Sequence, residues 1–374
     1  MLKVPYFEPW ITDNDKKMIM DALNQRWLTN GPFLKKFEKK FSKFIDIKHS
    51  IGVSSATHGL HLCLKSIGIG KGDEVIVPTM TFAATADAVT YCGAKPILVD
   101  VDKNTFNILP EQIKKKVNRK TKAIIPVHYG GQACNMDEIL QISKKNGIKI
   151  IEDCAHALGS KYGEMKCGKI GDMGCFSFYP TKIITTGEGG MITTKNMKLF
   201  KKITLLRSHG MNQLPPEREK HTKWKYDIIE LGYNYRLDEI RSALGFSQIQ
   251  RIRKINNLRI KIAKKYDNEL QKIKGIIIPK IEENRNHIFH LYTIKVNSDF
   301  PLTRDELFIK LHNSGIGTSV QYLPLHLMSY NKNKFKNSEF PNANKIKDQI
   351  LSLPIFPTMT EKQIDYVTSV IKKV

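Results

Sequence analysis

The sequence lacks any long apolar run and any paired cysteine motif. No stretch approaches the roughly 20 uninterrupted apolar residues that cross a bilayer, and residues 1–7 carry neither the apolar run nor the cleavage site of a secretory signal. We therefore expect a cytoplasmic protein without membrane insertion. Without a CxxC pair, neither a zinc site nor a disulfide framework is indicated, and we expect no metal. The six cysteines are Cys63, Cys92, Cys134, Cys154, Cys167 and Cys175.

Acidic residues are also in short supply, with 36 Asp and Glu against 60 Lys and Arg and a formal charge of +24. Such an excess suggests nucleic-acid binding, because Lys and Arg clusters bind phosphates by releasing counterions. The basic residues are, however, spread along the chain, as at 35–40 and 114–116, in the manner of solvated helix faces. Since no DNA-binding motif accompanies them, we expect no nucleic-acid partner. A positive potential would still attract a small polyanionic substrate.

The length of 374 residues suits a large domain plus a smaller one. From about residue 49, short apolar β-rich runs alternate with helical patterns, which predicts an α/β fold with crossover helices around a mainly parallel sheet. Buried strands are predicted at 50–53, 74–77, 96–99, 123–127 and 149–152, and helices at 59–67 and 136–145.

The pattern changes after Asp153. The runs at 175–178 and 190–193 lie close together, which favours a turn or hairpin over a crossover. One long amphipathic helix is predicted over 238–274, with the domain boundary inside it. We expect a large domain at 1–250, with an N-terminal arm, and a smaller α+β domain at 251–374. The latter is predicted to contain a strand at 290–296 and helices at 304–313 and 361–372.

Residues 53–60 (VSSATHGL) run from a predicted strand through hydroxyl side chains into a predicted helix. Backbone N–H groups at a helix start bind anions, and the helix dipole favours them. Ser55, Ala56 and Thr57 are therefore candidates for holding a phosphate group. The alternative is that Ser55 and Thr57 are plain N-caps.

Two acids, Glu152 and Asp153, follow each other at the end of a predicted strand. Ligands of open α/β sheets gather at the carboxyl ends of strands. Because side chains alternate along a strand, we choose Asp153 as the ligand-facing acid and expect Glu152 to point away. A carboxylate in that place would stabilise a protonated ring nitrogen. The alternative is that either acid caps the next helix.

Lys182 differs from other lysines in its neighbours. An aromatic run at 176–179 precedes it and a glycine-rich turn at 186–190 follows, which indicates a close approach of main chain and ligand. In a pocket near positive groups its amine would lose charge readily and become nucleophilic. Ser177 would add a hydrogen bond to a phosphate. Phe82 would lie flat on a ring, with ordinary core packing as its alternative.

A lysine, a carboxylate, phosphate donors and a flat side chain are what pyridoxal phosphate requires of a protein. Their order resembles the nucleotide-sugar aminotransferases of the DegT/StrS group, within the fold-type I pyridoxal-phosphate enzymes. The resemblance covers nearly the whole chain. Its segments are WLTNGP at 27–32, FE at 37–38, SSAT at 54–57, PTMTF at 78–82, IEDCAHALG at 151–159, residues 176–190, RSHG at 207–210, GYNYRL at 232–237 and YLPLH at 322–326.

By this resemblance Lys182 forms the Schiff base with the cofactor and Asp153 is the partner of its ring nitrogen. Asn234 matches a residue that reaches the phosphate from the neighbouring subunit, which implies a homodimer with shared active sites. Ala56 departs from the glycine of many members, although alanine also occurs there. The implied cofactor-binding residues are Ser55, Ala56, Thr57, Phe82, Asp153, His156, Ser177, Lys182 and Asn234. The implied substrate-binding residues are Trp27, Thr29, Tyr322 and His326.

The implied reaction transfers the amino group of L-glutamate to a UDP-, dTDP- or GDP-linked keto-deoxy sugar, for glycan or lipopolysaccharide synthesis. The histidine at position 156 favours amination at C4, and amination at C3 is the alternative. Lys182 speaks against the related branch that carries histidine there and dehydrates its substrate. A rival of another class is a non-catalytic regulatory or binding protein on the same scaffold.

Overall fold

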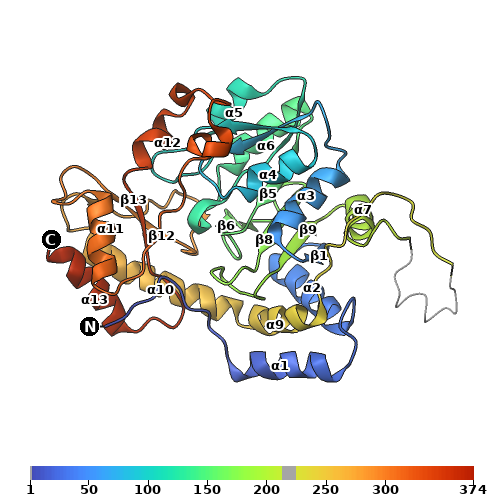
Figure 1. The fold of residues 1–374 in the computed structure, drawn as a ribbon, viewed down its shortest axis with the longest axis horizontal. Coiled ribbons are helices and arrows are strands. Elements are labelled where there is room, and N and C mark those ends of the chain that lie inside the picture. The colour runs from blue at the N-terminus through green and yellow to red at the C-terminus, as the bar shows by residue number, and fades with distance from the viewer. Residues whose placement is uncertain (1, 213–224) are drawn as a thin grey trace.

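The computed structural model describes residues 2–212 and 225–374, and Figure 1 shows a central sheet with helices around it. The helices are α1 (Asp13–Asn24), α2 (Pro32–Ile45), α3 (Ala56–Ser66), α4 (Ala84–Tyr91), α5 (Pro110–Lys116), α6 (Met136–Asn146), α7 (Met197–Arg207), α9 (Glu239–Gln250), α10 (Ile252–Leu270), α11 (Arg304–Asn313), α12 (Pro341–Ile346) and α13 (Glu361–Lys372). Among these described residues, no helix combines the length and apolar character needed to span a bilayer.

The described residues contain strands that form three sheets. In chain order, the strands are β1 (His49–Val53), β2 (Glu74–Pro78), β3 (Lys95–Val99), β4 (Thr121–Ile124), β5 (Lys149–Asp153), β6 (Lys161–Tyr162), β7 (Met165–Lys166), β8 (Met173–Ser177), β9 (Gly190–Thr194), β10 (Ile276–Ile277), β11 (Arg285–Asn286), β12 (Tyr292–Val296) and β13 (Ile350–Leu353). The central sheet has seven strands in the order β1-β9-β8-β5-β4-β2-β3. The smaller sheets have the orders β10-β12-β13 and β11-β6-β7.

The central sheet is mainly parallel, as predicted. Parallel pairing runs from β3 through β2, β4 and β5 to β8. Only β9 runs the other way within this sheet, since it is antiparallel to both neighbours, β8 and β1. The prediction of a hairpin rather than a crossover after Asp153 is confirmed, with Ser177 opposite Gly190. The α/β class is therefore confirmed.

Local capping signals explain why several helix boundaries agree with the prediction. Thr303 and Glu306 form a capping box that begins α11, and Thr360 and Gln363 form another that begins α13. Gly147 ends α6 with a φ of +66°, a conformation that glycine adopts without a steric cost. Short-range chemistry of this kind is visible in a sequence without knowledge of the tertiary fold.

The single long helix predicted over 238–274 is wrong. The chain forms two helices, α9 and α10, which meet at Arg251, where the backbone leaves the helical region with φ −107° and ψ 13°. The guanidinium of Arg251 donates to Oδ1 of Asp15 at 2.8 Å and to the carbonyl of Trp10 at 2.7 Å. The junction thereby holds the N-terminal segment, and α1 lies alongside α9 (Figure 1).

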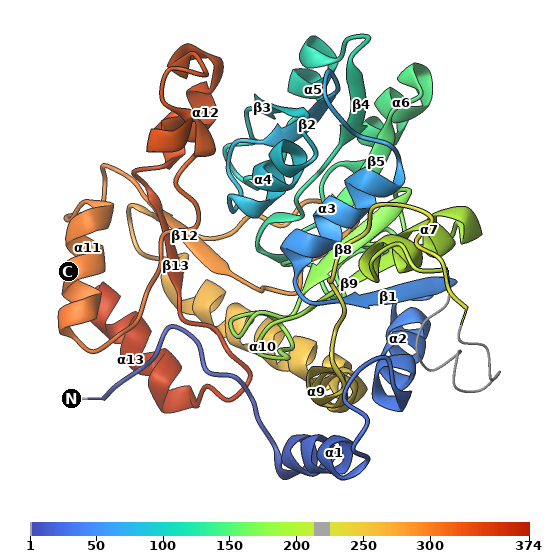
Figure 2. The same cartoon turned by 45° about the vertical axis from the view of Figure 1, so that its right-hand side comes forward.

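The C-terminal part has its own apolar core, built from α10, α11, α13, β12 and β13. Val4 joins this core and forms a bridge with Ile316, so the N-terminal arm packs with the second part of the chain. Figure 2 shows the N-terminus beside α11 and α13. The boundary near residue 250 stays a proposal that the separate core supports.

Helix α12, in the C-terminal part, is hydrogen-bonded to the segment that follows β3 in the large part. Asp100, which follows β3, accepts hydrogen bonds from the backbone N–H groups of Asn342 at 2.8 Å and Ala343 at 3.0 Å. A carboxylate at a helix start satisfies N–H groups that have no partner inside the helix. The segment that contains Tyr322 and His326 is held close to the central sheet by the N–H of Leu325, which donates to the carbonyl of Thr79 at 2.7 Å.

Candidate active site

The predicted site residues follow the carboxyl ends of several strands of the central sheet. Asp153 is the last residue of β5 and Ser177 the last of β8, while Ser55 comes shortly after β1 and Phe82 shortly after β2. These four strands run in the same direction, so their carboxyl ends meet at one edge. The alternation of strands and helices therefore gathers residues that are far apart in sequence.

Asp153 is 5% exposed and its carboxylate is held in a fixed orientation. Its Oδ2 accepts from the hydroxyl of Thr85 at 2.9 Å, and its Oδ1 accepts from the N–H of Ala155 at 3.1 Å. Burial raises the pKa of Asp153, and the two hydrogen bonds and the charge of Lys182 oppose that rise. A buried acid of this kind favours a cationic ring nitrogen as its partner.

Lys182 lies in the turn between β8 and β9, and its N–H donates to the carbonyl of Tyr179 at 2.9 Å. Burial lowers the pKa of Lys182 to about 8, and the nearby charge of Asp153 acts in the opposite direction. The turn that carries Lys182 follows β8, the strand that pairs with β5 and so with its end at Asp153. A lysine with this pKa presents an uncharged, nucleophilic amine far more often than a surface lysine does.

The start of α3 fits an anion. The hydroxyl oxygen of Ser55 accepts from the N–H of His58 at 3.1 Å, so Ser55 is an N-cap, while its O–H remains free to donate. Ala56 and Thr57 form the first turn, where N–H groups have no partner inside the helix. A Cβ on Gly190 would lie 2.8 Å from the nitrogen of Ala56, so glycine permits β9 to approach there.

Ser177 faces Gly190 across the β8–β9 pair and so lies close to this helix start. The backbone at Ala56 has no positive φ, which explains why alanine is tolerated where glycine is usual. Ser55, Ala56, Thr57 and Ser177 thus come from neighbouring segments. Their roles toward the phosphate of the cofactor stay predictions.

The contact between His156, which follows β5, and Tyr322 brings the second part of the chain to the same edge of the central sheet. The N–H of Gly130 donates to Nδ1 of His156 at 3.3 Å, so Nε2 carries the proton and lies 3.0 Å from the hydroxyl of Tyr322. Burial and the charge of Lys182 keep the pKa of His156 well below its usual value. The ring of Phe82 lies 6.2 Å from that of Tyr322 and is 62% exposed, which excludes ordinary core packing for Phe82.

Three further predicted residues come from segments near the start of α9, and the neighbour of Asn234, Tyr235, accepts through its carbonyl from the N–H of Ser54 at 3.0 Å. Trp27 donates its indole N–H to the carbonyl of Thr29, and Thr29 forms a bridge with Asp238. Asn234 is exposed and pairs through its backbone with Ser208. Their roles toward cofactor and substrate stay predictions.

His326 lies buried in contacts of its own, with an exposed fraction of 6%. Its Nδ1 lies 2.7 Å from the hydroxyl of Thr79, and its Nε2 lies 3.2 Å from Oδ1 of Asn337 and 3.0 Å from that of Asn344. The ring stacks on Phe340 with centroids 4.0 Å apart. Both ring nitrogens are therefore already engaged, and this geometry favours a structural role over the predicted contact with substrate.

Sequence reasoning missed the partners of the predicted residues. Thr85, which holds Asp153, stands four residues after Thr81, and their hydroxyls lie 2.8 Å apart; the cluster of threonines beside Phe82 was its only signal. Gly130 acts on His156 through its backbone N–H, which no side-chain pattern reveals. His290, whose ring centroid lies 4.4 Å from that of His156, comes from a distant segment.

A mainly parallel α/β sheet with a low-pKa lysine, a buried acid and an anion-binding helix start defines a pyridoxal-phosphate site of the fold-type I kind. The chain belongs to the DegT/DnrJ/EryC1/StrS aminotransferase family, whose sequence profile matches residues 9–372.

Comparisons with individual proteins agree with this assignment. The chain is 38% identical to the spore coat polysaccharide biosynthesis protein SpsC of Bacillus subtilis, over 99% of this chain and 97% of that protein. It is 36% identical to the GDP-perosamine synthase of Caulobacter vibrioides, over 98% and 96%. It superposes on the putative sugar aminotransferase Spr1654 of Streptococcus pneumoniae with a TM-score of 0.93 and 30% identity, covering 100% and 98%.

Spr1654 has been solved in forms with pyridoxal phosphate and with pyridoxamine phosphate. The predicted family, fold type, enzyme class and cofactor are therefore confirmed. The individual site residues and the exact substrate stay predictions.

Proposed function

We propose that this sugar aminotransferase moves the amino group of L-glutamate to C4 of a nucleotide-linked keto-deoxy sugar. The observation that carries the proposal is that the half-buried Lys182 and the buried Asp153 come from adjacent strands at the carboxyl edge of the sheet, with the pKa of the lysine lowered to about 8. The names of the relatives SpsC and GDP-perosamine synthase support a sugar linked to a nucleotide and destined for a polysaccharide. His156 supports C4 through the family resemblance.

Each residue has a role in this reaction. Bound pyridoxal phosphate supplies an electron sink. Asp153 keeps the ring nitrogen protonated, and the start of α3 with Ser177 holds the phosphate. Nζ of Lys182 would move the proton from Cα of the amino donor to the cofactor carbon that bears the nitrogen, and in the second half-reaction it would move a proton from that carbon to the sugar carbon that receives the nitrogen. The hydroxyl of Tyr322 lies 3.0 Å from Nε2 of His156 and so links the C-terminal part to the site.

We further propose a homodimer in which Asn234 of one subunit serves the site of the other. Large apolar side chains are exposed in segments next to predicted site residues: Leu231 at 82% and Tyr179 at 47%. Exposed apolar groups of this size favour burial against a partner, and two-fold assemblies are common. Mixing inactive Lys182→Ala subunits with inactive Asn234→Ala subunits should restore activity, because mixed dimers regain one intact site. No recovery from stable mixed dimers would contradict shared sites.

The substrate is tested with the visible absorption spectrum of the purified enzyme. L-glutamate should remove the band of the bound cofactor, and the matching keto sugar should restore it. UDP-, dTDP- and GDP-linked sugars with the ketone at C3 or C4 form the panel, and NMR of the product locates the new amine. An amine at C3 would replace the C4 assignment. A spectrum that no amino donor changes would contradict the proposal as a whole.

A further inference from the structure

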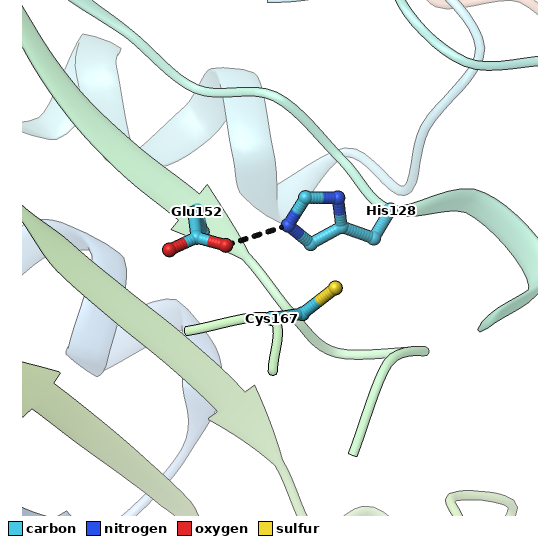
Figure 3. Close-up of side chains that lie close together, drawn as sticks. All are labelled: His128, Glu152 and Cys167. Carbon is cyan, nitrogen blue, oxygen red and sulfur yellow. Dashed lines mark hydrogen bonds and ion pairs between the residues drawn. The ribbon is translucent and has the colours of Figure 1, made fainter. Parts of the chain in front are cut away.

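Behind Asp153, on the other face of β5, lies a buried cluster of His128, Glu152 and Cys167 (Figure 3). The side chains of His128 and Glu152 are 0% exposed, and Cys167 is equally buried. Glu152 points away from its neighbour Asp153, as strand alternation predicts. The ligand atoms of the three residues lie within 4.8 Å of one another, a spacing that suits either a metal ion or a hydrogen-bonded unit.

The hydrogen bonds of Glu152 favour the second alternative. Its Oε1 accepts from the N–H groups of Ile170 and Gly171, both at 2.8 Å. Its Oε2 accepts from the N–H of Gly168 at 2.9 Å and lies 2.9 Å from Nε2 of His128. A carboxylate offers about four lone-pair sites, and all four are used. A metal ion would have to displace bonds that are already made.

The protonation of His128 follows from its other nitrogen. The backbone N–H of Cys134 donates to Nδ1 of His128 at 3.1 Å, so Nδ1 holds a lone pair. The ring proton is therefore on Nε2 and is donated to Glu152. Cys167 lies beside this pair, as Figure 3 shows, with its thiol close to the ring of His128.

The backbone of His128 is also hydrogen-bonded to the backbone of Asp153. The N–H of His128 donates to the carbonyl of Asp153 at 3.2 Å, and the N–H of Asp153 donates to the carbonyl of Pro126 at 2.9 Å. The chain at 126–128 thus holds the backbone of Asp153, and the His128–Glu152 bond locks the adjacent residue on the opposite face. Since the direction of a strand side chain follows its backbone, these contacts fix where the carboxylate of Asp153 points.

We propose that His128 and Glu152 are positioning residues for Asp153, which keep its carboxylate aligned with the ring nitrogen of the cofactor. The inference rests on the proposed role of Asp153. Outer hydrogen-bond partners have comparable effects behind metal ligands, where their loss costs about 10–100-fold in affinity or activity. The same order of effect is expected here, in kcat more than in the KM of the sugar substrate.

Two substitutions of His128 distinguish a positioning role from a purely structural one. In His128→Asn, the side-chain oxygen takes the place of Nδ1 and still accepts from the N–H of Cys134, but the bond to Glu152 is lost. In His128→Gln, the amide nitrogen takes the place of Nε2 and still donates to Glu152, but the bond to Cys134 is lost. His128→Asn should shift the absorption band of the holoenzyme in the direction of Asp153→Asn and lower kcat about 10–100-fold. His128→Gln should restore most of both.

Glu152→Gln provides a second measurement, because its amide group would face the N–H groups of His128 and Gly168. It should reproduce the spectral shift even if His128→Asn fails to fold. Cys92→Ala is the control, since it changes a buried cysteine outside the cluster, and it should leave spectrum and kcat as in the wild type. Thermal unfolding of each variant is measured alongside.

The outcomes are distinguishable. If His128→Asn and His128→Gln lower the unfolding temperature alike and neither changes the spectrum, the pair is structural and the inference is wrong. Wild-type spectrum and kcat in Glu152→Gln would overturn it equally. If Asp153→Asn itself has no effect on spectrum or kcat, the failure lies in the proposed role of Asp153.

Discussion

The carboxyl edge of the central sheet and the segment around His326 both carry residues from recognisable motifs, but they use them differently. At the edge, Asp153 is buried and Lys182 half-buried, and burial lowers the pKa of the lysine amine to about 8. At His326, both ring nitrogens are taken up by Thr79, Asn337 and Asn344. A motif therefore indicates that a residue is constrained, and its unused bonding capacity indicates whether it serves a ligand.

The largest effect is expected at the edge, from Lys182→Ala. Without the amine there is neither a covalent anchor nor a group to carry the proton from Cα of the donor, and general acid–base catalysis alone contributes about 10²–10⁴-fold. Turnover should become undetectable in a coupled assay for 2-oxoglutarate, while circular dichroism remains that of a folded protein. The control is Lys332→Ala, which removes an exposed lysine. Turnover near the wild-type rate in Lys182→Ala would falsify the assignment.

The next effect is expected from Asp153→Asn. The amide keeps one acceptor for Thr85 or Ala155 but cannot hold a proton on the ring nitrogen by charge. We expect kcat to fall about 100-fold, at the lower end of losses from impaired proton transfer, with a shifted absorption band. Asp87→Asn, which changes an acid on α4, is the matched control. Unchanged kinetics would mean that another carboxylate faces the cofactor.

Tyr322→Phe tests the link between the two regions, because Tyr322 belongs to the C-terminal motif and yet bonds to His156. Loss of its hydroxyl leaves the buried Nε2–H of His156 unpaired, at a cost of about 1–3 kcal/mol. We expect kcat/KM to fall about tenfold, the lower part of that range. Tyr330→Phe, in an exposed tyrosine, should change nothing. If both variants behave alike, the bond to His156 has no part in the reaction.

The sequence predicted the features that depend on local patterns and missed those that depend on contacts between distant residues. The strands, the β8–β9 hairpin and the starts of α11 and α13 depend on local periodicity and capping, so they were predicted well. Lys182 and Asp153 stood out because the cofactor demands particular groups at strand ends. The break at Arg251 was missed because it depends on Asp15 and Trp10, which are distant in sequence.

His326→Leu is expected to act on stability more than on the reaction. The substitution leaves the hydroxyl of Thr79 and the amide groups of Asn337 and Asn344 without their partner, which costs about 1–3 kcal/mol of the free energy of unfolding. Urea unfolding measures this cost, and Thr79→Val, which removes the same bond from the other side, should lose a similar amount. A large rise in the KM of the nucleotide sugar with unchanged stability would instead restore the predicted substrate contact.

The smallest effect concerns the pH dependence of stability in the cofactor-free enzyme. The pKa of Lys182 is about 8 when folded and 10.5 when unperturbed. Between those values the unfolded chain binds more protons at this position, so the free energy of unfolding should rise with pH across that window. Below about pH 8 both states are protonated and the effect levels off.

Because other groups titrate as well, the measurement is the difference in the free energy of unfolding between wild type and Lys182→Met, followed by urea unfolding from pH 7 to 10.5. The substitution should remove this part of the slope. Parallel curves would mean that the amine is not poised as the edge of the sheet requires, and the contrast with the segment around His326 would lose its basis.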